Sequence, residues 1–128
     1  MDLATIEEWA DAYITAQSDP DLLKGDGDHP LWWAVERSMF YEGETNPEDL
    51  WSFVLKVLEK APDKKVLSVL AAGPLEELIS HVGMTFIVRI EAEARRNPAF
   101  RHLLGGVWRH GASEEIWSRV EAARGSSW

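Results

Sequence analysis

The chain has no cysteine among its 128 residues. This absence excludes disulfide bonds, thiolate zinc sites and cysteine nucleophiles. The phosphate-binding pattern GxxxxGK(S/T), the hydrolase pattern GxSxG and the zinc pattern HExxH are also missing. Basic residues are scarce, because 13 Lys and Arg stand against 22 Asp and Glu, for a formal net charge of -9. Nucleic-acid affinity comes mainly from Lys and Arg that neutralise phosphates, so we do not expect a nucleic-acid partner.

Long apolar runs are missing as well. No segment approaches the roughly 20 consecutive apolar residues of a membrane-spanning helix. The segment Met1–Glu8 is acidic, whereas a secretory signal begins with basic residues. We therefore expect a cytoplasmic protein without a membrane partner. The composition, with 45% apolar and 27% charged residues, is typical of a globular chain, and we expect residues 1–128 to form a single domain.

Helix start and stop signals recur along the chain. Thr5 and Glu8 have the spacing of a capping box, in which each side chain bonds the backbone N–H of the other residue. Asn46 before Pro47 is a second start signal, and Gly73 has the place of a left-handed residue that ends a helix. Apolar residues recur at helical spacing between such signals. The predicted helices cover residues 5–17, 30–42, 46–58, 63–72, 75–81, 85–96, 98–104 and 113–124.

No segment shows the apolar and polar alternation of a strand. The predicted fold is therefore all-α, with seven to eight short helices. The linkers beyond residue 63 are short, which favours antiparallel helical pairs. Two arrangements remain open, an α-solenoid-like fragment and a compact orthogonal bundle. The helix over residues 50–58 is apolar almost all round, so we expect it at the centre of the fold. A homodimer contact through this helix or the final one is a further possibility.

The acidic excess lies in the first half of the chain. Residues 1–63 contain 15 acids and 4 bases, whereas residues 64–128 contain 7 acids and 9 bases. Such an asymmetry can mark a charged surface that contacts a basic partner. The plainer explanation, that the acids solvate the outer faces of the first helices, is the favoured one.

Seven tryptophans dominate the aromatic residues. Four have apolar neighbours at helical spacing and are predicted to lie in the core: Trp9, Trp51, Trp108 and Trp117. Trp32 and Trp33 lie about 100° apart on a helix, so both cannot face one core, and we expect Trp33 at its margin. Trp128 is expected to be disordered or to fold back over an apolar patch. Exposed tryptophan beside acids is typical of a protein interface. The predicted partner-binding residues are Asp26, Asp28, His29, Trp32 and Trp33.

The segment 69–108 reads VLAAGPLEELISHVGMTFIVRIEAEARRNPAFRHLLGGVW. It combines AGPLE, His-x-Gly, Ile-Glu-x-x-Ala, Pro-x-Phe-Arg and GGVW. In this combination it resembles a family of small bacterial proteins that carry a domain of unknown function. The matching positions are Gly73, Pro74, Leu75, Glu76, His81, Gly83, Ile90, Glu91, Ala94, Pro98, Phe100, Arg101, Gly105, Gly106, Val107 and Trp108. The resemblance implies a bacterial, cytoplasmic and helical protein, and it assigns no catalytic residue.

Polar residues of this segment form a second candidate site. The alternative pocket consists of Glu76, His81, Glu91, Arg101 and Trp108. Glu91 and Arg101 lie on neighbouring predicted helices, and an ion pair that clamps the corner between them is the favoured explanation of these two residues. Arg89 and Glu93 have the i to i+4 spacing of a helical ion pair.

Histidine and aspartate give only a weak metal signal. The candidate ligands are His29, His81, His102 and His110, with Asp26 or Asp28. No two of the histidines lie at i, i+3 or i, i+4 spacing. The acidic loop resembles the start of a calcium loop, but Pro30 occupies the third ligand position and Arg37 the twelfth, where a glutamate belongs. No metal, cofactor or catalytic residue is therefore predicted.

The leading interpretation is a non-enzymatic protein-interaction domain, immunity- or adaptor-like, whose acidic first half contacts a basic partner. The alternative is a small-ligand-binding or hydrolytic domain that uses the second candidate site. A fully buried Trp33 would exclude the specific interface. A pocket with convergent polar groups would favour the alternative.

Overall fold

The computed structural model describes residues 2–25, 28–39 and 46–128. Among these residues it contains helices and no strand, so the predicted all-α fold is confirmed. The elements are α1 (Leu3–Ser18), α2 (Trp32–Ser38), α3 (Pro47–Glu59), α4 (Lys64–Leu70), the π turn η1 (Ala71–Leu75), α5 (Glu76–Arg96), α6 (Pro98–Leu104) and α7 (Glu114–Ala123). Because α4, η1 and α5 are continuous, the described residues form six helical segments rather than the predicted seven to eight.

Side-chain caps begin most of these helices, as the local sequence signals predicted. Asn46 and Ser113 accept hydrogen bonds from backbone N–H groups in the first turns of α3 and α7. The predicted capping box of Thr5 and Glu8 is wrong. Asp2 accepts the hydrogen bond of the Thr5 N–H at 2.8 Å, and α1 therefore begins before the predicted position.

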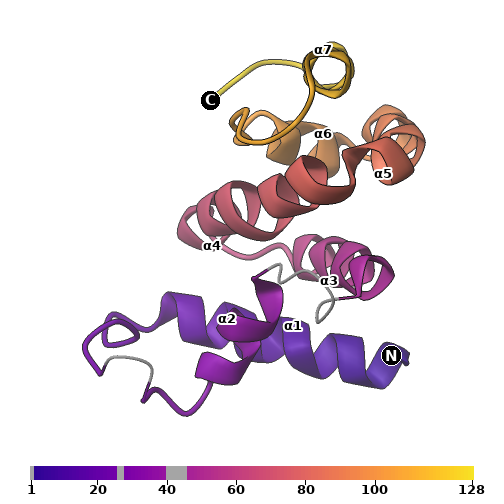
Figure 1. The fold of residues 1–128 in the computed structure, drawn as a ribbon. Helices are drawn as coiled ribbons and strands as arrows, with labels where there is room; N and C mark the ends of the chain where they lie inside the picture. Colours follow the sequence, from indigo (N-terminus) through magenta and orange to yellow (C-terminus); the bar gives the residue numbers. More distant parts are fainter. Residues whose placement is uncertain (1, 26–27, 40–45) are drawn as a thin grey trace.

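The helices are stacked in chain order (Figure 1). α1 and α2 form one end of the molecule, α3 and the continuous helix 64–96 lie in the middle, and α6 and α7 form the other end. α1 packs against α2, α3 and α4, whereas α5 packs against α6 and α7. The stack therefore places the acidic first half and the remaining half of the chain at opposite ends.

The hydrophobic core runs through the stack and is centred on α3. The buried residues of this helix are Leu50, Trp51, Phe53, Val54, Val57 and Leu58. Trp9 stacks on Phe53 with ring centroids 4.0 Å apart, and Trp51 meets Phe100 at 5.5 Å. The predicted core positions of Trp9 and Trp51 are confirmed, and Trp117 is half-buried. Because α3 is already buried within the chain, its apolar face is not open to a second copy.

The helix end predicted at Gly73 is wrong, because the helix continues through this residue. Pro74 has no N–H to donate to the preceding turn. The turn Ala71–Leu75 takes up this break by widening to π geometry, in which the Glu76 N–H donates to the carbonyl of Ala71, five residues back. The proline thus widens the helix locally and does not end it.

The break predicted between residues 81 and 85 is present as a kink. The backbone leaves helical geometry at Val82, where φ is -133° and ψ is 27°, and α5 continues beyond it. A Cβ built on Gly83 would lie 2.9 Å from Cγ2 of Ile116 in α7. The glycine therefore allows α5 and α7 to approach each other closely.

By its length and composition alone, the continuous helix 64–96 could cross a membrane. Core helices of soluble proteins can have the same length and composition. In this fold the helix packs against α1, α3, α6 and α7.

Trp128 folds back against the end of α6. Its Nε1–H donates to the carbonyl of His102 at 2.8 Å, and its backbone N–H donates to the carbonyl of Gly105 at 2.9 Å. A Cβ built on Gly106 would lie 2.7 Å from atoms of the Trp128 ring. Of the two predicted alternatives for this residue, the structure shows the folded-back one.

Candidate functional site

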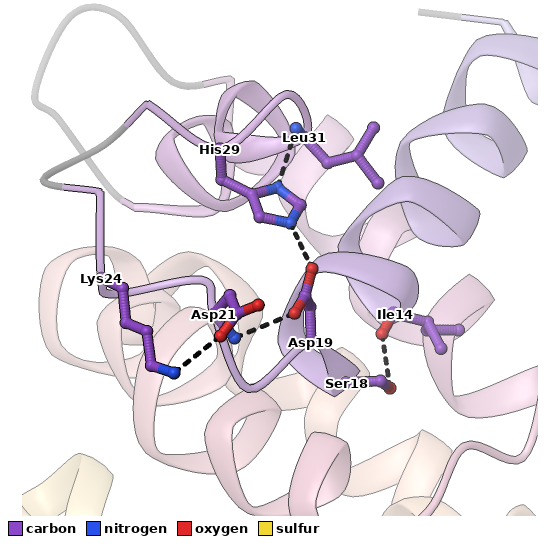
Figure 2. Close-up of polar contacts among 7 residues, drawn as sticks. All are labelled: Ile14, Ser18, Asp19, Asp21, Lys24, His29 and Leu31. Carbon is purple, nitrogen blue, oxygen red and sulfur yellow. Dashed lines mark hydrogen bonds and ion pairs between the residues drawn. The ribbon is translucent and has the colours of Figure 1, made fainter.

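The loop between α1 and α2 holds the predicted interface residue His29 in an internal network (Figure 2). Its Nε2–H donates to the Asp19 carboxylate at 2.7 Å, and its Nδ1 accepts from the Leu31 N–H at 3.0 Å. Because Nδ1 accepts a hydrogen bond, the ring hydrogen is assigned to Nε2. The N–H of Asp21 also donates to Asp19, at 2.9 Å, and this bond and that of His29 lower the pKa of Asp19. Both ring nitrogens of His29 are thus used within the loop.

The other predicted interface residues lie at the surface or at the margin of the core. Asp28 is exposed, and Asp26 lies outside the described residues. Trp32 and Trp33 are half-buried and pack against the hydrophobic core. The Arg37 guanidinium carbon lies 4.9 Å from the Trp33 ring centroid, a cation–π contact within the chain. Trp33 is not fully buried, so the interface is not excluded and stays a prediction.

The five residues of the alternative pocket do not converge on one site. Glu76 accepts a hydrogen bond from the Trp108 N–H at 3.0 Å, which ties the start of α5 to the loop after α6. The Trp108 residue is 76% exposed, so its predicted core position is wrong. Val107 is buried instead. Apolar neighbours in the sequence do not determine which of two adjacent loop side chains turns inward.

Glu91 pairs with Arg119 of α7 and not with Arg101. Arg119 Nε lies 3.0 Å from Glu91 Oε2, and this hydrogen bond lowers the pKa of Glu91. The predicted corner clamp is therefore wrong, because the partner comes from α7, which packs along α5. Glu91 and Arg101 nevertheless line one depression of about 290 Å³.

The ion pair predicted between Arg89 and Glu93 is also wrong. Arg89 binds Glu48 of α3, with Nη1 2.6 Å from Oε2. Glu93 is 7% exposed and accepts hydrogen bonds from Arg96 at 2.6 Å and Asn97 at 2.9 Å. Burial alone would raise the pKa of Glu93, but these hydrogen bonds outweigh burial and lower it. Arg89 and Glu91 thus tie α5 to α3 and α7, whereas Glu93 bonds within the last turn of α5 and its C-cap.

The histidines lie in separate contacts. His29 and His81 each bond to one carboxylate, and the ring of His102 lies 5.2 Å from that of Trp128. Within the part of the chain that the structure describes, no three His, Asp or Glu side chains gather as metal ligands would.

A groove opens beside the π turn, between α1, α2 and the continuous helix 64–96. We call it the π-turn groove and define it by Tyr13, Gln17, Ser38, Gly73, Pro74 and Glu77. Its volume is about 510 Å³, within the range of roughly 300–1,000 Å³ that is usual for small-molecule sites. The rest of its lining is apolar and comes from α2 with its C-cap and from the continuous helix.

Polar side chains from three helices meet in the π-turn groove. Burial raises the pKa of the Tyr13 hydroxyl, which therefore stays protonated near neutral pH. Ser38 donates its hydroxyl hydrogen to the carbonyl of Val35 at 2.6 Å, so its oxygen keeps lone pairs that can accept. Glu77 is the one charged residue among the described residues that line the groove. His81 Nε2 lies 3.0 Å from its carboxylate.

Gly73 stands directly before Pro74, where the Cβ of a larger residue would crowd the proline ring in helical geometry. A Cβ built on Gly73 would meet no atom within 4 Å outside its chain neighbours and its own helix backbone, and its φ is not in the left-handed region. Glycine inside a helix costs roughly 0.5–1 kcal/mol relative to alanine. The missing side chain leaves the π-turn groove open at the cost of some helix stability.

Sequence reasoning missed Tyr13, Ser38 and Glu77. The i to i+4 spacing of Glu77 and His81 was visible, and a proline inside an apolar segment could have marked a widened turn. Tyr13 and Ser38 come from α1 and α2, and no local pattern connects those helices with the start of α5. Their place in one groove is a property of the tertiary fold.

Comparison with known proteins assigns this chain to a family without a described activity. No curated protein and no solved structure matches the chain. A family model described as "Family of unknown function (DUF6869)" matches residues 23–127. The match includes Ser38, Gly73 and Glu77 of the π-turn groove, whereas Tyr13 and Gln17 precede it. The chain therefore belongs to this family of unknown function.

Proposed function

We propose that this protein binds a small ligand in the π-turn groove. The observation that carries the proposal is the groove itself, a space of about 510 Å³ between three helices. Gly73 adds no side chain to this space, because a Cβ built there would meet no described atom within 4 Å beyond its own helix and chain neighbours. The groove residues also have the composition of a binding site, with an apolar lining and a few polar groups.

The proposal concerns binding and not catalysis. Ser38 donates its hydroxyl hydrogen to a backbone carbonyl rather than to a general base. The Tyr13 hydroxyl stays protonated, because burial raises its pKa. Tyr13 and Ser38 are only 1% and 4% exposed, and they are not arranged as a nucleophile and its base.

The predicted contact with a basic protein partner has less geometric support. The Arg37 guanidinium already lies over the ring of Trp33. Both ring nitrogens of His29 form hydrogen bonds within its loop. The segment around α2 therefore offers less free aromatic and polar surface than its sequence indicates. The groove is the better supported candidate.

A substitution that fills the groove tests the proposal. We expect Gly73→Leu to remove binding of 2-phenylethanol, a small neutral probe, because the new side chain would occupy the open space. Lys65→Leu is the matched control, since it places the same side chain on an exposed position of α4 outside the groove lining. Two-dimensional NMR titration of both variants and the wild type measures binding at each backbone amide.

The wild type and Lys65→Leu are expected to show probe-dependent shifts that centre on the amides of Ala72 and Gly73, next to Pro74, which has no amide N–H. Thermal unfolding of Gly73→Leu checks that this variant is folded. If folded Gly73→Leu binds the probe as the wild type does, or if the wild type shows no shifts around the groove, the proposal is wrong.

A further inference from the structure

We propose that the ligand of the π-turn groove is a small primary amine with an apolar body. This inference rests on the proposed function and adds the charge and hydrogen-bonding character of the ligand. It follows from the one carboxylate in the groove, from the acceptors around it and from the charge of the surrounding helices.

The charge at the groove favours a cation. Glu77 is a carboxylate whose side chain is 32% exposed, and no Lys or Arg is among the described residues that line the groove. Two of its walls, α1 and α2, belong to the half of the chain that contains 15 acids and 4 bases. Clefts lined by one sign of charge concentrate ligands of the opposite sign. An anionic ligand would meet the Glu77 carboxylate, and no Lys or Arg from the described lining could pair with it.

The hydrogen-bonding groups of the groove match a donor-rich head group. A primary ammonium group has three N–H donors and no acceptor. The Ser38 oxygen has lone pairs left after its own donation, and the Gln17 amide has a carbonyl oxygen. The Glu77 carboxylate has about four acceptor positions. His81 bonds to one of its oxygens, so the carboxylate can still accept a hydrogen bond from a second donor.

The remaining lining sets the size of the body. Apolar surface from Val35, Val69 and Pro74 faces a space of about 510 Å³. Such a space holds a ring-sized hydrophobic group, and the described residues that line it include no second charged side chain for a polar tail. The structure therefore points to a compact apolar amine and not to a polyamine or an amino acid with a free carboxylate.

Three probes of similar size test this inference: phenethylamine, 2-phenylethanol and phenylacetate. They have the same two-carbon chain on a phenyl ring and carry a cationic, neutral or anionic head group, the second chain carbon of phenylacetate being that of the carboxylate. We expect phenethylamine to bind the wild type about tenfold more tightly than the alcohol, because a hydrogen bond to a charged group is stronger than a neutral one. Phenylacetate is expected to bind most weakly. NMR titration at low and high salt measures all three affinities.

Two neighbouring carboxylates provide matched variants. Glu77→Gln is expected to weaken phenethylamine binding about tenfold and to change 2-phenylethanol binding by less than about twofold. Glu76→Gln makes the same chemical change one residue away, where the carboxylate binds the Trp108 N–H and does not line the groove. It is expected to leave the order and size of the three affinities unchanged.

The outcomes separate this inference from the proposed function. Binding of none of the three probes to the wild type would overturn both. Equal binding of the three, tightest binding of phenylacetate, or an equal effect of Glu76→Gln and Glu77→Gln would overturn amine selectivity and leave the groove as a binding site. Tighter binding of a trilysine peptide than of phenethylamine would assign the groove to a basic protein segment and overturn the small-amine inference.

Discussion

Gly73 and Gly83 lie in the same continuous helix, and a side chain would meet opposite surroundings at the two positions. At Gly83 a Cβ would be 2.9 Å from Cγ2 of Ile116, whereas at Gly73 it would meet nothing within 4 Å beyond its own helix. Both residues lower the intrinsic stability of the helix. Close packing of α5 and α7 accounts for Gly83, whereas Gly73 has no such contact with the described residues and stands directly before Pro74. The comparison shows that one helical glycine can be explained by tertiary packing and another by its neighbour in the chain.

The largest effect is expected for Gly83→Ala. The added methyl group would collide with Cγ2 of Ile116, which cannot move freely because Ile is branched at Cβ. We expect a loss of about 2 kcal/mol in the free energy of unfolding, because overpacking outweighs the better helix propensity of alanine. Urea unfolding measures the change. Gly83→Ala combined with Ile116→Leu should recover part of the loss, since leucine has no Cγ2 at that point. A stabilised Gly83→Ala would remove the contrast between the two glycines.

A smaller loss is expected for Trp128→Ala, which extends the comparison to a third glycine. The Trp128 ring covers Gly106, and the residue is half-exposed. We expect a loss of about 1–1.5 kcal/mol, below the ~3–5 kcal/mol of a fully buried tryptophan. Gly106→Ala should destabilise the wild type but have little effect once Trp128 is alanine. Independent, additive effects in chemical denaturation of the single and double variants would contradict the contact.

The smallest effect is expected for Gly73→Ala. Alanine has the better helix propensity, but its Cβ would crowd the ring of Pro74, the next residue in the chain, so the two effects oppose each other. We expect a change of less than about 0.5 kcal/mol in the free energy of unfolding. The same urea titration that is used for Gly83→Ala measures it, which makes the two substitutions directly comparable. A loss as large as that of Gly83→Ala would remove the contrast between the two glycines.

The fold was predictable from the sequence where local signals decide it. Asn46 and Ser113 begin helices because their side chains can accept from N–H groups of the next turn, a bond within three residues in the chain. The apolar pattern of α3 likewise predicted a central helix. Predictions based on glycine and proline were less accurate, because tertiary packing overrides local helix preference at these residues. At Gly73 and Gly83 the helix continues because its faces are held by the helices on either side.

The candidate site was less predictable, because its residues meet only in the folded chain. Glu91 has Arg119 as its partner, although Arg101 was nearer in the sequence. The π-turn groove joins Tyr13 of α1 with Glu77 of α5, and no spacing rule relates residues so far apart. Sequence patterns identified the start of α5 as a place of polar residues. The packing of α1 and α2 determines which of them line a groove.

The π turn also bears on the length of the chain. A π turn, closed by a hydrogen bond between residues five apart, holds one residue more than an α turn. The helices on either side of Ala71–Leu75 are therefore in the same register as in an unbroken α-helix with one residue fewer. Loss of a single residue there would thus leave the packing faces of α4 and α5 in place.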